Sequence, residues 1–204
     1  KATVSDKSEV FLVQHRETGR FYIKKHLSIY DRELYTSLKD MNIPGIPRIY
    51  HIAEDGNRLI VIEEYINGTP LSSFISEHGP FSACDAADII SNLCDILSVL
   101  HSCTPPIIHR DIKPQNIMLL DSSDMQVTLI DFNASKKFDS GKNYDTCLMG
   151  TAEYAAPEQF GFSQSDARTD IYALGILLNI LITGCFPKDV LCSGSAARVV
   201  TKCT

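Results

Sequence analysis

The sequence predicts an α+β fold with two lobes, a small sheet-rich lobe over residues 1–66 and a larger, mostly helical lobe over residues 67–204. Two observations predict it. The first part contains short strand-like runs separated by turn signals, and in the second part apolar residues recur at helical spacing. Strands and helices that occupy different parts of a chain are typical of α+β folds.

The first lobe is expected to contain four strands and one helix. Glu17-Thr18-Gly19 is a hairpin turn signal between the first two strands. The helix is predicted over residues 30–41, where Leu34 and Leu38 lie at helical spacing, and Pro44-Gly45 ends it. The strand-like runs are residues 10–13, 20–24, 48–52 and 59–62.

The second lobe begins with a connector, Asn67-Gly68-Thr69-Pro70, beyond which the pattern changes to helices. Residues 135–147 are polar and aperiodic, which indicates a surface loop. A long amphipathic helix is expected where one face carries Ile89, Leu93, Ile96, Leu97 and Leu100.

Composition narrows the possible classes of protein. A chain of 204 residues with 44% hydrophobic content can bury a substantial core. A net charge of −6 argues against a nucleic-acid-binding surface, which needs a basic stripe. The longest apolar run, residues 176–182, has the length of a buried helix rather than a membrane span.

The seven cysteines predict reduced thiols and a cytoplasmic protein. They show no Cys-x-x-Cys pairing and no nearby histidine cluster, so neither a disulfide framework nor a zinc site is expected. Cys84, Cys94 and Cys185 lie in apolar helical stretches and are expected to be buried.

Three motifs point to phosphoryl transfer. They are His109-Arg110-Asp111-Ile112-Lys113-Pro114-Gln115-Asn116, Asp131-Phe132-Asn133 and Ala156-Pro157-Glu158. An acid with a lysine two residues on and an asparagine five residues on, followed by a second acid after a hairpin, suits a reaction that needs positioning and charge neutralisation. In order and spacing the motifs resemble those of the catalytic domain of eukaryotic-type (Hanks-type) protein serine/threonine kinases. Among these kinases, they resemble the motifs of bacterial members.

This resemblance covers nearly the whole chain and implies a two-lobed kinase fold that is incomplete at both ends and lacks its last helices. ATP and Mg²⁺ are the implied cofactors, and a protein with a serine or threonine acceptor is the implied substrate. The missing region would deprive Glu158 of an arginine partner. It would also leave the apolar faces near Ile176, Leu177 and Ile180 less covered, so self-association is expected to be possible.

The resemblance assigns roles to the catalytic-loop residues. It makes Asp111 the group that orients the acceptor hydroxyl and accepts its proton, and Lys113 the cation at the transferring phosphate. Asn116 and Asp131 would hold the metal. Thr151, in Gly150-Thr151, would form hydrogen bonds with Asp111 and Lys113. The presence of Gly150-Thr151 with this catalytic loop favours serine or threonine over tyrosine as the substrate residue.

Neighbouring residues have structural or regulatory roles in this interpretation. His109 is expected to pack inside the loop, and Asp170 to hold the backbone of the catalytic loop. Arg110 could neutralise a phosphate on the activation loop, and the alternative is a salt bridge to an unphosphorylated acid. Candidate phosphorylation sites are Ser135, Ser140 and Thr146, although a solvated hydroxyl is the simpler interpretation of each.

Phe21-Tyr22-Ile23-Lys24 resembles the strand whose lysine reaches the α- and β-phosphates of ATP. Strand alternation would then place Lys25 on the opposite, solvated face. The expected partner of Lys24 is Glu33 on the following helix, and the alternative is that Glu33 is a surface residue.

The nucleotide loop departs from the kinase pattern, because residues 2–10 contain no glycine. Glycines let the backbone approach phosphate closely, and Ser5 and Ser8 can do so less well. With Val10 they are the expected nucleotide contacts here. Glu9 adds an unfavourable charge, so modest ATP affinity is expected.

Glu63-Glu64-Tyr65-Ile66 resembles the hinge, where adenine would bind the backbone at Glu64 and Ile66. Glu63 would stand behind the adenine, where a carboxylate must be paired, hydrogen-bonded or protonated. Lys24 is a candidate partner, and a surface position at the strand end is the alternative.

Two other functions remain open. A pseudokinase that acts as a scaffold or nucleotide sensor would fit the glycine-free loop and Asn133, which replaces glycine but tolerates positive φ better than most residues. The residues that oppose this alternative are Lys24, Asp111, Lys113, Asn116 and Asp131. A small-molecule phosphotransferase is a weaker alternative, because that class lacks the Gly-Thr…Ala-Pro-Glu segment.

Overall fold

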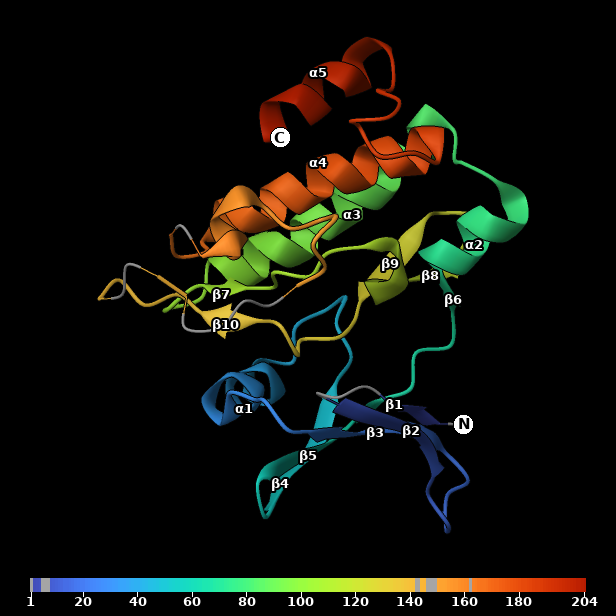
Figure 1. Cartoon of the computed structure of the whole chain (residues 1–204). Helices are drawn as coiled ribbons and strands as arrows, with labels where there is room; N and C mark the ends of the chain where they lie inside the picture. The colour runs from blue at the N-terminus through green and yellow to red at the C-terminus, as the bar shows by residue number, and fades with distance from the viewer. Residues whose placement is uncertain (1, 5–7, 142–143, 146–149, 162) are drawn as a thin grey trace. The chain divides into compact units, whose positions relative to one another are not determined.

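A computed structural model of the chain describes residues 2–4, 8–141, 144–145, 150–161 and 163–204. Its contacts divide the chain into two compact units, Lys1–Asn67 and Gly68–Thr204 (Figure 1). The predicted α+β class is confirmed, with a sheet in the first unit and mainly helices in the second.

The first unit is an antiparallel sheet in the order β1-β2-β3-β5-β4. A turn closed by the amide of Gly19, which donates to His15 O at 2.9 Å, joins β2 to β3, so the predicted hairpin is confirmed. The strands are β1 Ala2–Val4, β2 Ser8–Gln14, β3 Phe21–Leu27, β4 Ile49–Asp55 and β5 Arg58–Glu64.

The helix of the first unit, α1, spans Arg32–Met41. Its first turn is capped by Asp31, whose carboxylate accepts the Leu34 amide at 3.0 Å. It ends at Asn42, which adopts a left-handed conformation with φ of 45°. Leu34 and Leu38 are buried, as their spacing predicted.

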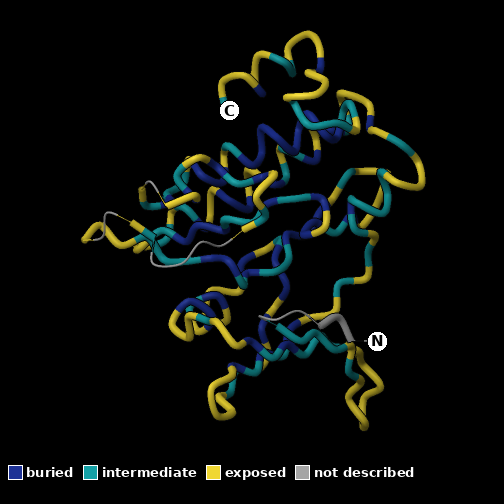
Figure 2. The backbone as a smooth tube through the Cα atoms, in the orientation of Figure 1, coloured by how far each residue is buried: buried dark blue, intermediate teal, exposed yellow. Residues whose placement is uncertain are grey.

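The second unit is built around two long helices, α3 Ala83–His101 and α4 Ala167–Thr183. α4 packs against α3 on one side and against α5, Gly194–Cys203, on the other (Figure 1). Burial is greatest along α4, where a continuous stretch from Ala173 to Leu181 is shielded from solvent (Figure 2).

Shorter elements carry the loops of the second unit. Strand β6, Thr69–Pro70, forms the end of the connector, and helix α2, Leu71–His78, follows it; neither was predicted. β6 pairs with a hairpin of β8 Ile117–Asp121 and β9 Gln126–Leu129, and β7 Ile107–Ile108 pairs with β10 Lys136–Lys137. Single 3-10 turns cover Pro114–Asn116 and Pro157–Phe160.

Asn179 organises the loop that follows α4. Its side chain is fully buried, and its amide nitrogen donates to Cys185 O at 2.9 Å and to Val190 O at 2.7 Å. Its amide oxygen accepts the Cys192 amide at 2.8 Å. One side chain therefore satisfies three backbone groups that would otherwise need water or other partners.

Two expectations about burial are wrong. Ile176, Leu177 and Ile180 are at most 7% exposed, so the apolar surface expected there is covered within the chain itself. Cys84 and Cys94 are exposed because they occupy positions of α3 that do not belong to its apolar face. The six cysteines that the structure describes are free thiols.

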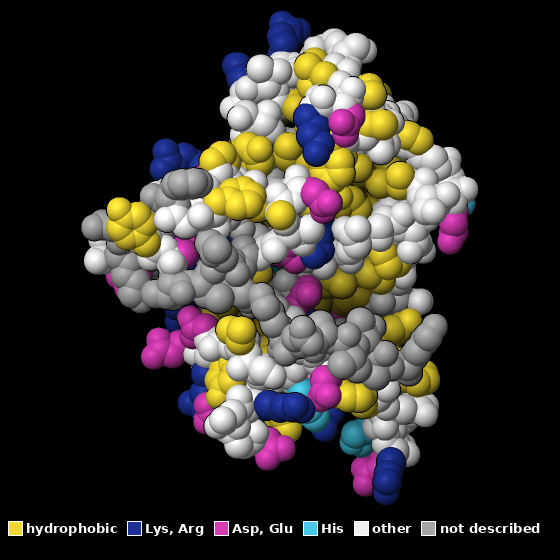
Figure 3. Space-filling model, in the orientation of Figure 1, with side chains coloured by type: hydrophobic (Ala, Val, Ile, Leu, Met, Phe, Trp, Pro, Cys, Tyr) yellow, Lys and Arg dark blue, Asp and Glu magenta, His cyan; other side chains and the backbone are white. Residues whose placement is uncertain are grey.

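The surface carries charges of both signs. On the face shown in Figure 3, basic and acidic side chains are interspersed. In the part of the chain that the structure describes, none of the helices has the length and apolarity that a membrane crossing requires.

Candidate active site

The catalytic loop is held by α4 at its backbone. The carboxylate of Asp170, which is fully buried, accepts the amides of His109 and Arg110 at 2.9 and 2.8 Å. It also contacts His101 Nε2 at 2.8 Å. Arg110 adopts a left-handed conformation with φ of 66°, which turns the chain before Asp111. The structural role predicted for Asp170 is confirmed.

Asp111, Lys113 and Thr151 form one hydrogen-bonded group. Thr151 Oγ1 donates to Asp111 Oδ1 at 2.8 Å, and Lys113 Nζ lies 2.8 Å from Asp111 Oδ2 and 2.7 Å from Thr151 Oγ1. The group joins the catalytic loop to a segment forty residues later, as the sequence predicted for Thr151. It places a carboxylate, a cation and an aliphatic hydroxyl in mutual contact.

Asp111 is ionised at neutral pH. Burial alone would raise the pKa of its carboxyl group, but the hydrogen bond and charge of Lys113 and the hydrogen bond of Thr151 outweigh burial and hold that pKa below its usual value. His109 behaves differently, because its complete burial dominates and lowers its pKa. It packs edge-on against Phe132, with ring centroids 4.9 Å apart, as expected for a structural residue.

Asn116 and Asp131 are brought near each other by the β8–β9 hairpin. Ile130, which precedes Asp131, donates its amide to Asn116 O at 2.8 Å. The side-chain amide of Asn116 donates to Asp111 O and Oδ2, each at 2.8 Å, and this fixes its orientation. The amide oxygen of Asn116 and the carboxylate of Asp131 are hard oxygen donors of the kind that Mg²⁺ prefers.

The backbone strain in this segment lies at Asp131 rather than at Asn133. Asp131 has φ of 68°, whereas Asn133 is outside the left-handed region. The tolerance of asparagine for positive φ therefore has no bearing on Asn133 in this structure. Replacing the usual glycine costs little here, because no unusual conformation is required at that position.

Arg110 contacts an unphosphorylated acid, which is one of its two expected partners. Its Nη1 lies 3.3 Å from Asp145 Oδ2. Ser135 is buried, and its hydroxyl donates to His109 O at 3.1 Å, so it is not the solvated loop residue that the sequence suggested. Ser140 is exposed, and Thr146 lies outside the described residues.

In the first unit the buried lysine of β3 is Lys25. Its Nζ lies 2.7 Å from Glu63 Oε1, and the two side chains are 6% and 9% exposed. The expectation that Lys25 is solvated is therefore wrong, and so is the pairing of Glu63 with Lys24. The requirement that Glu63 be paired is confirmed.

The register of the sheet explains this correction. Lys25 lies opposite Val61 on β5, and Glu63 is two residues further along β5, so both side chains point to the same face. Leu27 and Leu59 lie on that face and are fully buried. In the sequence, Lys25 lies two residues before the apolar Leu27, so strand alternation places both on the same face. The match to the kinase strand motif nevertheless favoured Lys24.

The other predicted nucleotide contacts are distributed over the first unit. Ser8 and Val10 lie on β2, and Ser5 lies outside the described residues. Glu33 is exposed on α1. Lys24 is partly exposed, and its strand neighbour in β5 is Ile62.

Glu9 and Glu64 each form a polar contact within this unit, Glu9 through its carboxylate and Glu64 through its backbone amide. Glu9, which lies on β2, contacts Arg58 Nη1 at 2.9 Å, so its negative charge is compensated. The amide of Glu64 donates to Arg48 O at 2.8 Å, so a contact between adenine and Glu64 would use the carbonyl group.

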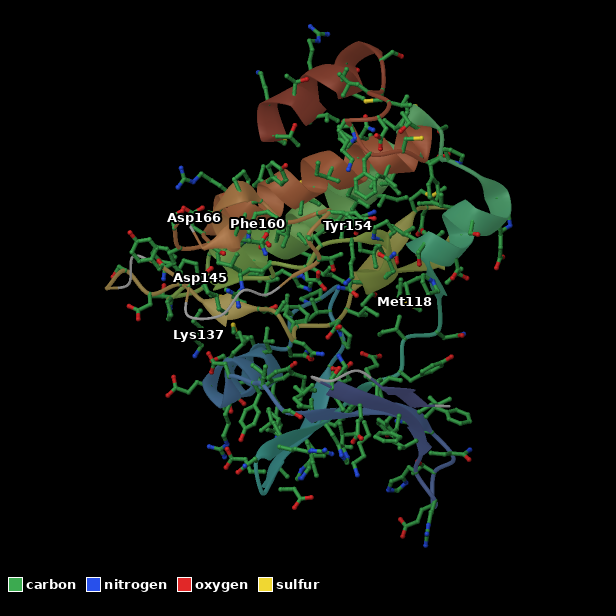
Figure 4. The ribbon with its side chains drawn as sticks, in the orientation of Figure 1. Met118, Lys137, Asp145, Tyr154, Phe160 and Asp166 are labelled. Atoms are coloured by element: carbon green, nitrogen blue, oxygen red, sulfur yellow. The ribbon has the colours of Figure 1, made fainter. Side chains whose placement is uncertain are left out.

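Glu158 forms a hydrogen bond with another residue of the chain. Its Oε1 accepts the hydroxyl of Thr169, in the first turn of α4, at 2.6 Å. Figure 4 shows the neighbouring side chains of this segment, with Tyr154 and Phe160 labelled. Tyr154 packs on Phe186 with ring centroids 5.2 Å apart.

Residues 6–196 match the family described as "Protein kinase domain". The chain belongs to this family. The kinase domain is 31% identical over 166 residues to a Dictyostelium discoideum protein named "Probable myosin light chain kinase", which covers 81% of this chain and 52% of that protein. It is 31% identical to serine/threonine-protein kinase B and 38% identical to serine/threonine-protein kinase D of Synechocystis sp..

These two Synechocystis matches cover 84% and 71% of this chain. They cover only 31% and 28% of the lengths of the relatives. The kinase domain thus spans between about a quarter and about half of the curated relatives named here.

Proposed function

We propose that this domain is a protein serine/threonine kinase, which transfers the γ-phosphate of ATP to a serine or threonine hydroxyl of a protein substrate. The observation that carries the proposal is the hydrogen-bonded group of Asp111, Lys113 and Thr151. The Thr151 hydroxyl, which donates to Asp111 Oδ1 at 2.8 Å, supports the proposal because an acceptor hydroxyl of a substrate would make the same kind of contact.

Each member of the group has a role in the proposed reaction. Asp111 orients the acceptor hydroxyl and takes its proton as the new bond between oxygen and the γ-phosphorus forms and the bond to the bridging oxygen of ADP breaks. A carboxylate with a low pKa is a weak base, so its main contribution is orientation, with the proton transferred late. Lys113 opposes the negative charge of the transferring group.

Asn116 and Asp131 are the residues that would hold Mg²⁺, which neutralises phosphate charge when it is bound. In the ranges that the structure describes, no cluster of three or more His, Cys, Asp or Glu side chains suits a metal ion. Such a sparse donor set fits Mg²⁺, because this ion is commonly bound through one or two side chains together with substrate phosphates.

For the nucleotide phosphates, Lys25 is a stronger candidate than Lys24, because its buried partner Glu63 holds its ammonium group in place. Lys24 remains the prediction from the motif. The further predicted nucleotide contacts are Ser5, Ser8, Val10, Glu33, Glu64 and Ile66.

The test is a phosphorylation assay with ATP, Mg²⁺ and a mixture of serine-, threonine- and tyrosine-containing peptides, followed by identification of the labelled residue. The control is Asp111→Asn, which keeps an oxygen for the Thr151 hydroxyl but removes the charge. We expect kcat to fall by about a thousandfold or more, with little change in the affinity for ATP. Near-normal turnover by this variant would contradict the role of Asp111.

The pseudokinase alternative is favoured by the glycine-free stretch at residues 2–10. A thermal-shift titration with Mg²⁺-ATP distinguishes it from the proposal. A protein that is stabilised by the nucleotide but labels none of the peptides would support a nucleotide sensor. Labelling of a small hydroxylated metabolite or antibiotic instead of peptides would support a small-molecule phosphotransferase.

A further inference from the structure

Asp145 is a carboxylate outside the catalytic group that contacts three other side chains. Its side chain is 7% exposed although it belongs to the polar segment that the sequence predicted as a surface loop. Lys136 Nζ binds its Oδ1, and Arg110 Nη1 lies 3.3 Å from its Oδ2. The amide and hydroxyl of Ser165 donate to Oδ2 at 3.1 and 2.5 Å.

The partners of Asp145 come from three separate segments. Arg110 precedes Asp111 in the catalytic loop, and Lys136 is on β10, which pairs with β7 just before that loop. Ser165 directly precedes Asp166, the N-cap of α4. Figure 4 shows Asp145 in this region, between Lys137 of β10 and Asp166. Asp145 therefore connects the polar segment of residues 135–147, called the activation segment below, to the catalytic loop and the start of α4.

Arg110 is held at both ends. Asp170 accepts its backbone amide, and its Nε donates to Ala134 O at 2.6 Å. Its carbonyl oxygen accepts Gln159 Nε2 at 2.8 Å. Asp145 contacts the end of the guanidinium group at 3.3 Å, so the residue next to Asp111 also contacts a negative charge from the polar segment of residues 135–147.

We propose that Asp145 is a positioning residue that supplies, within the unmodified chain, the negative charge that Arg110 and Lys136 require, so that the catalytic loop is held for phosphoryl transfer without phosphorylation of the activation segment. This inference rests on the proposed kinase activity. A phosphate on this segment would meet cations that already contact a carboxylate. Ser135, one of the candidate acceptors, is buried and hydrogen-bonded to the catalytic loop.

The hydrogen bonds and the positive charge around Asp145 favour the ionised form of its carboxyl group. Burial would raise the pKa of its carboxyl group, but the hydrogen bonds of Lys136 and Ser165 and the charge of Lys136 outweigh burial and lower it. The group is therefore ionised throughout the neutral range.

The experiment compares phosphate-free and phosphorylated protein. The whole chain is treated with a phosphatase, and intact-mass measurement verifies that it carries no phosphate. We expect its kcat on a peptide substrate to equal that of the untreated protein within about twofold. Activity that appears only after phosphorylation within residues 135–149 would overturn the inference and leave the proposed kinase function standing. Inactivity of both forms would overturn both.

Asp145→Asn tests the charge itself. We expect kcat to fall by about 10- to 100-fold while KM for ATP changes little, because a displaced catalytic loop misplaces Asp111. Asp145→Glu should recover part of the activity. Asp139→Asn is the matched control, since it removes an exposed charge from the same segment and keeps an acceptor for the Gly141 amide. Equal kcat values for Asp145→Asn and Asp139→Asn would overturn the inference.

A double-mutant cycle separates positioning from a general loss of folding. Because Asp145 is proposed to act through Arg110, adding Arg110→Gln to Asp145→Asn should lower kcat little further. All variants are assayed well below their own melting temperatures. Fully multiplicative effects of the two substitutions on kcat would contradict the assigned route.

Discussion

Lys25 and Glu63 are two opposite charges that are both removed from water in the interior of the first unit. Taking either charge out of water is costly, and the short contact between them compensates for this only while both are present. Neighbouring Lys24 is partly exposed, so its charge stays in contact with water.

Substitution of the two lysines should therefore have unequal effects on stability. Lys25→Met leaves Glu63 buried and unpaired, and we expect it to lower the free energy of unfolding by about 3–5 kcal/mol. Lys24→Met should lower it by less than about 1 kcal/mol. Urea unfolding of the two variants measures the difference.

The double variant Lys25→Met, Glu63→Leu provides the decisive comparison. With neither charge present, most of the lost stability should return. A double variant as unstable as Lys25→Met alone would mean that packing, rather than the unpaired carboxylate, causes the loss.

At this scale the sequence predicted the contacts around Asp111 better than it predicted which lysine of β3 is buried. The contacts of Asp111 with Lys113 and Asn116 follow from short spacings, and Thr151 belongs to a segment with a specific pattern. The choice between Lys24 and Lys25 depended instead on which face of β3 is buried. That face is set by pairing with β5, which lies more than thirty residues away.

Among the elements, α4 and the loop after it depend on Asn179, whose one side chain supplies both donors and an acceptor to three backbone groups. Asn92 on α3 provides a simpler case, since its amide nitrogen donates to Met125 O at 3.0 Å.

Replacement of Asn179 by alanine should be costly. It leaves three backbone groups without their partner, and we expect a loss of about 2–4 kcal/mol in the free energy of unfolding. Asn92→Ala removes one partly buried hydrogen bond and should cost about 1 kcal/mol. Chemical unfolding of both variants measures the contrast, and equal losses would show that the loop after α4 re-forms its bonds with water.

The elements with long, regular patterns were predicted correctly, notably α1, α3 and the β2–β3 hairpin. Helix α2 was not predicted, because Leu71–His78 is short and lacks a long apolar repeat. Strands β7 and β10 have two residues each, so only the pairing between distant segments defines them.

For the molecule as a whole, stability should depend on pH through buried ionisable groups. Burial lowers the pKa of His109, so the folded chain keeps it neutral while the unfolded chain takes up a proton below about pH 6.5. Proton uptake by the unfolded state reduces stability as the pH falls. Asp111 and Asp145 have lowered pKa values, so the stability they confer is lost only at lower pH, as the pH falls through those values.

The unfolding midpoint should therefore decrease between pH 7 and pH 5, and His109→Phe should flatten this decrease because it removes the titrating group and keeps an aromatic ring next to Phe132. Urea titrations at several pH values measure the two slopes. Identical slopes for the wild-type protein and the variant would exclude His109 as the cause.

The division into a sheet-rich and a helical part followed from the change in periodicity near residue 67, and the motifs predicted the family. The covering of Ile176 and Ile180 could not be predicted in the same way. It depends on tertiary packing, in which Tyr154 and Ile75, both outside α4 and distant in sequence, pack with Ile176 and Ile180.

The exposed thiols of Cys84 and Cys94 have a practical consequence for work with the purified protein. In air, accessible thiols on two molecules can oxidise to an intermolecular disulfide, which would join copies through α3 without any non-covalent affinity between them. A dimer that disappears on addition of a reducing agent would then reflect storage conditions. Replacing both cysteines with serine would give a protein whose association state can be measured without this cross-link.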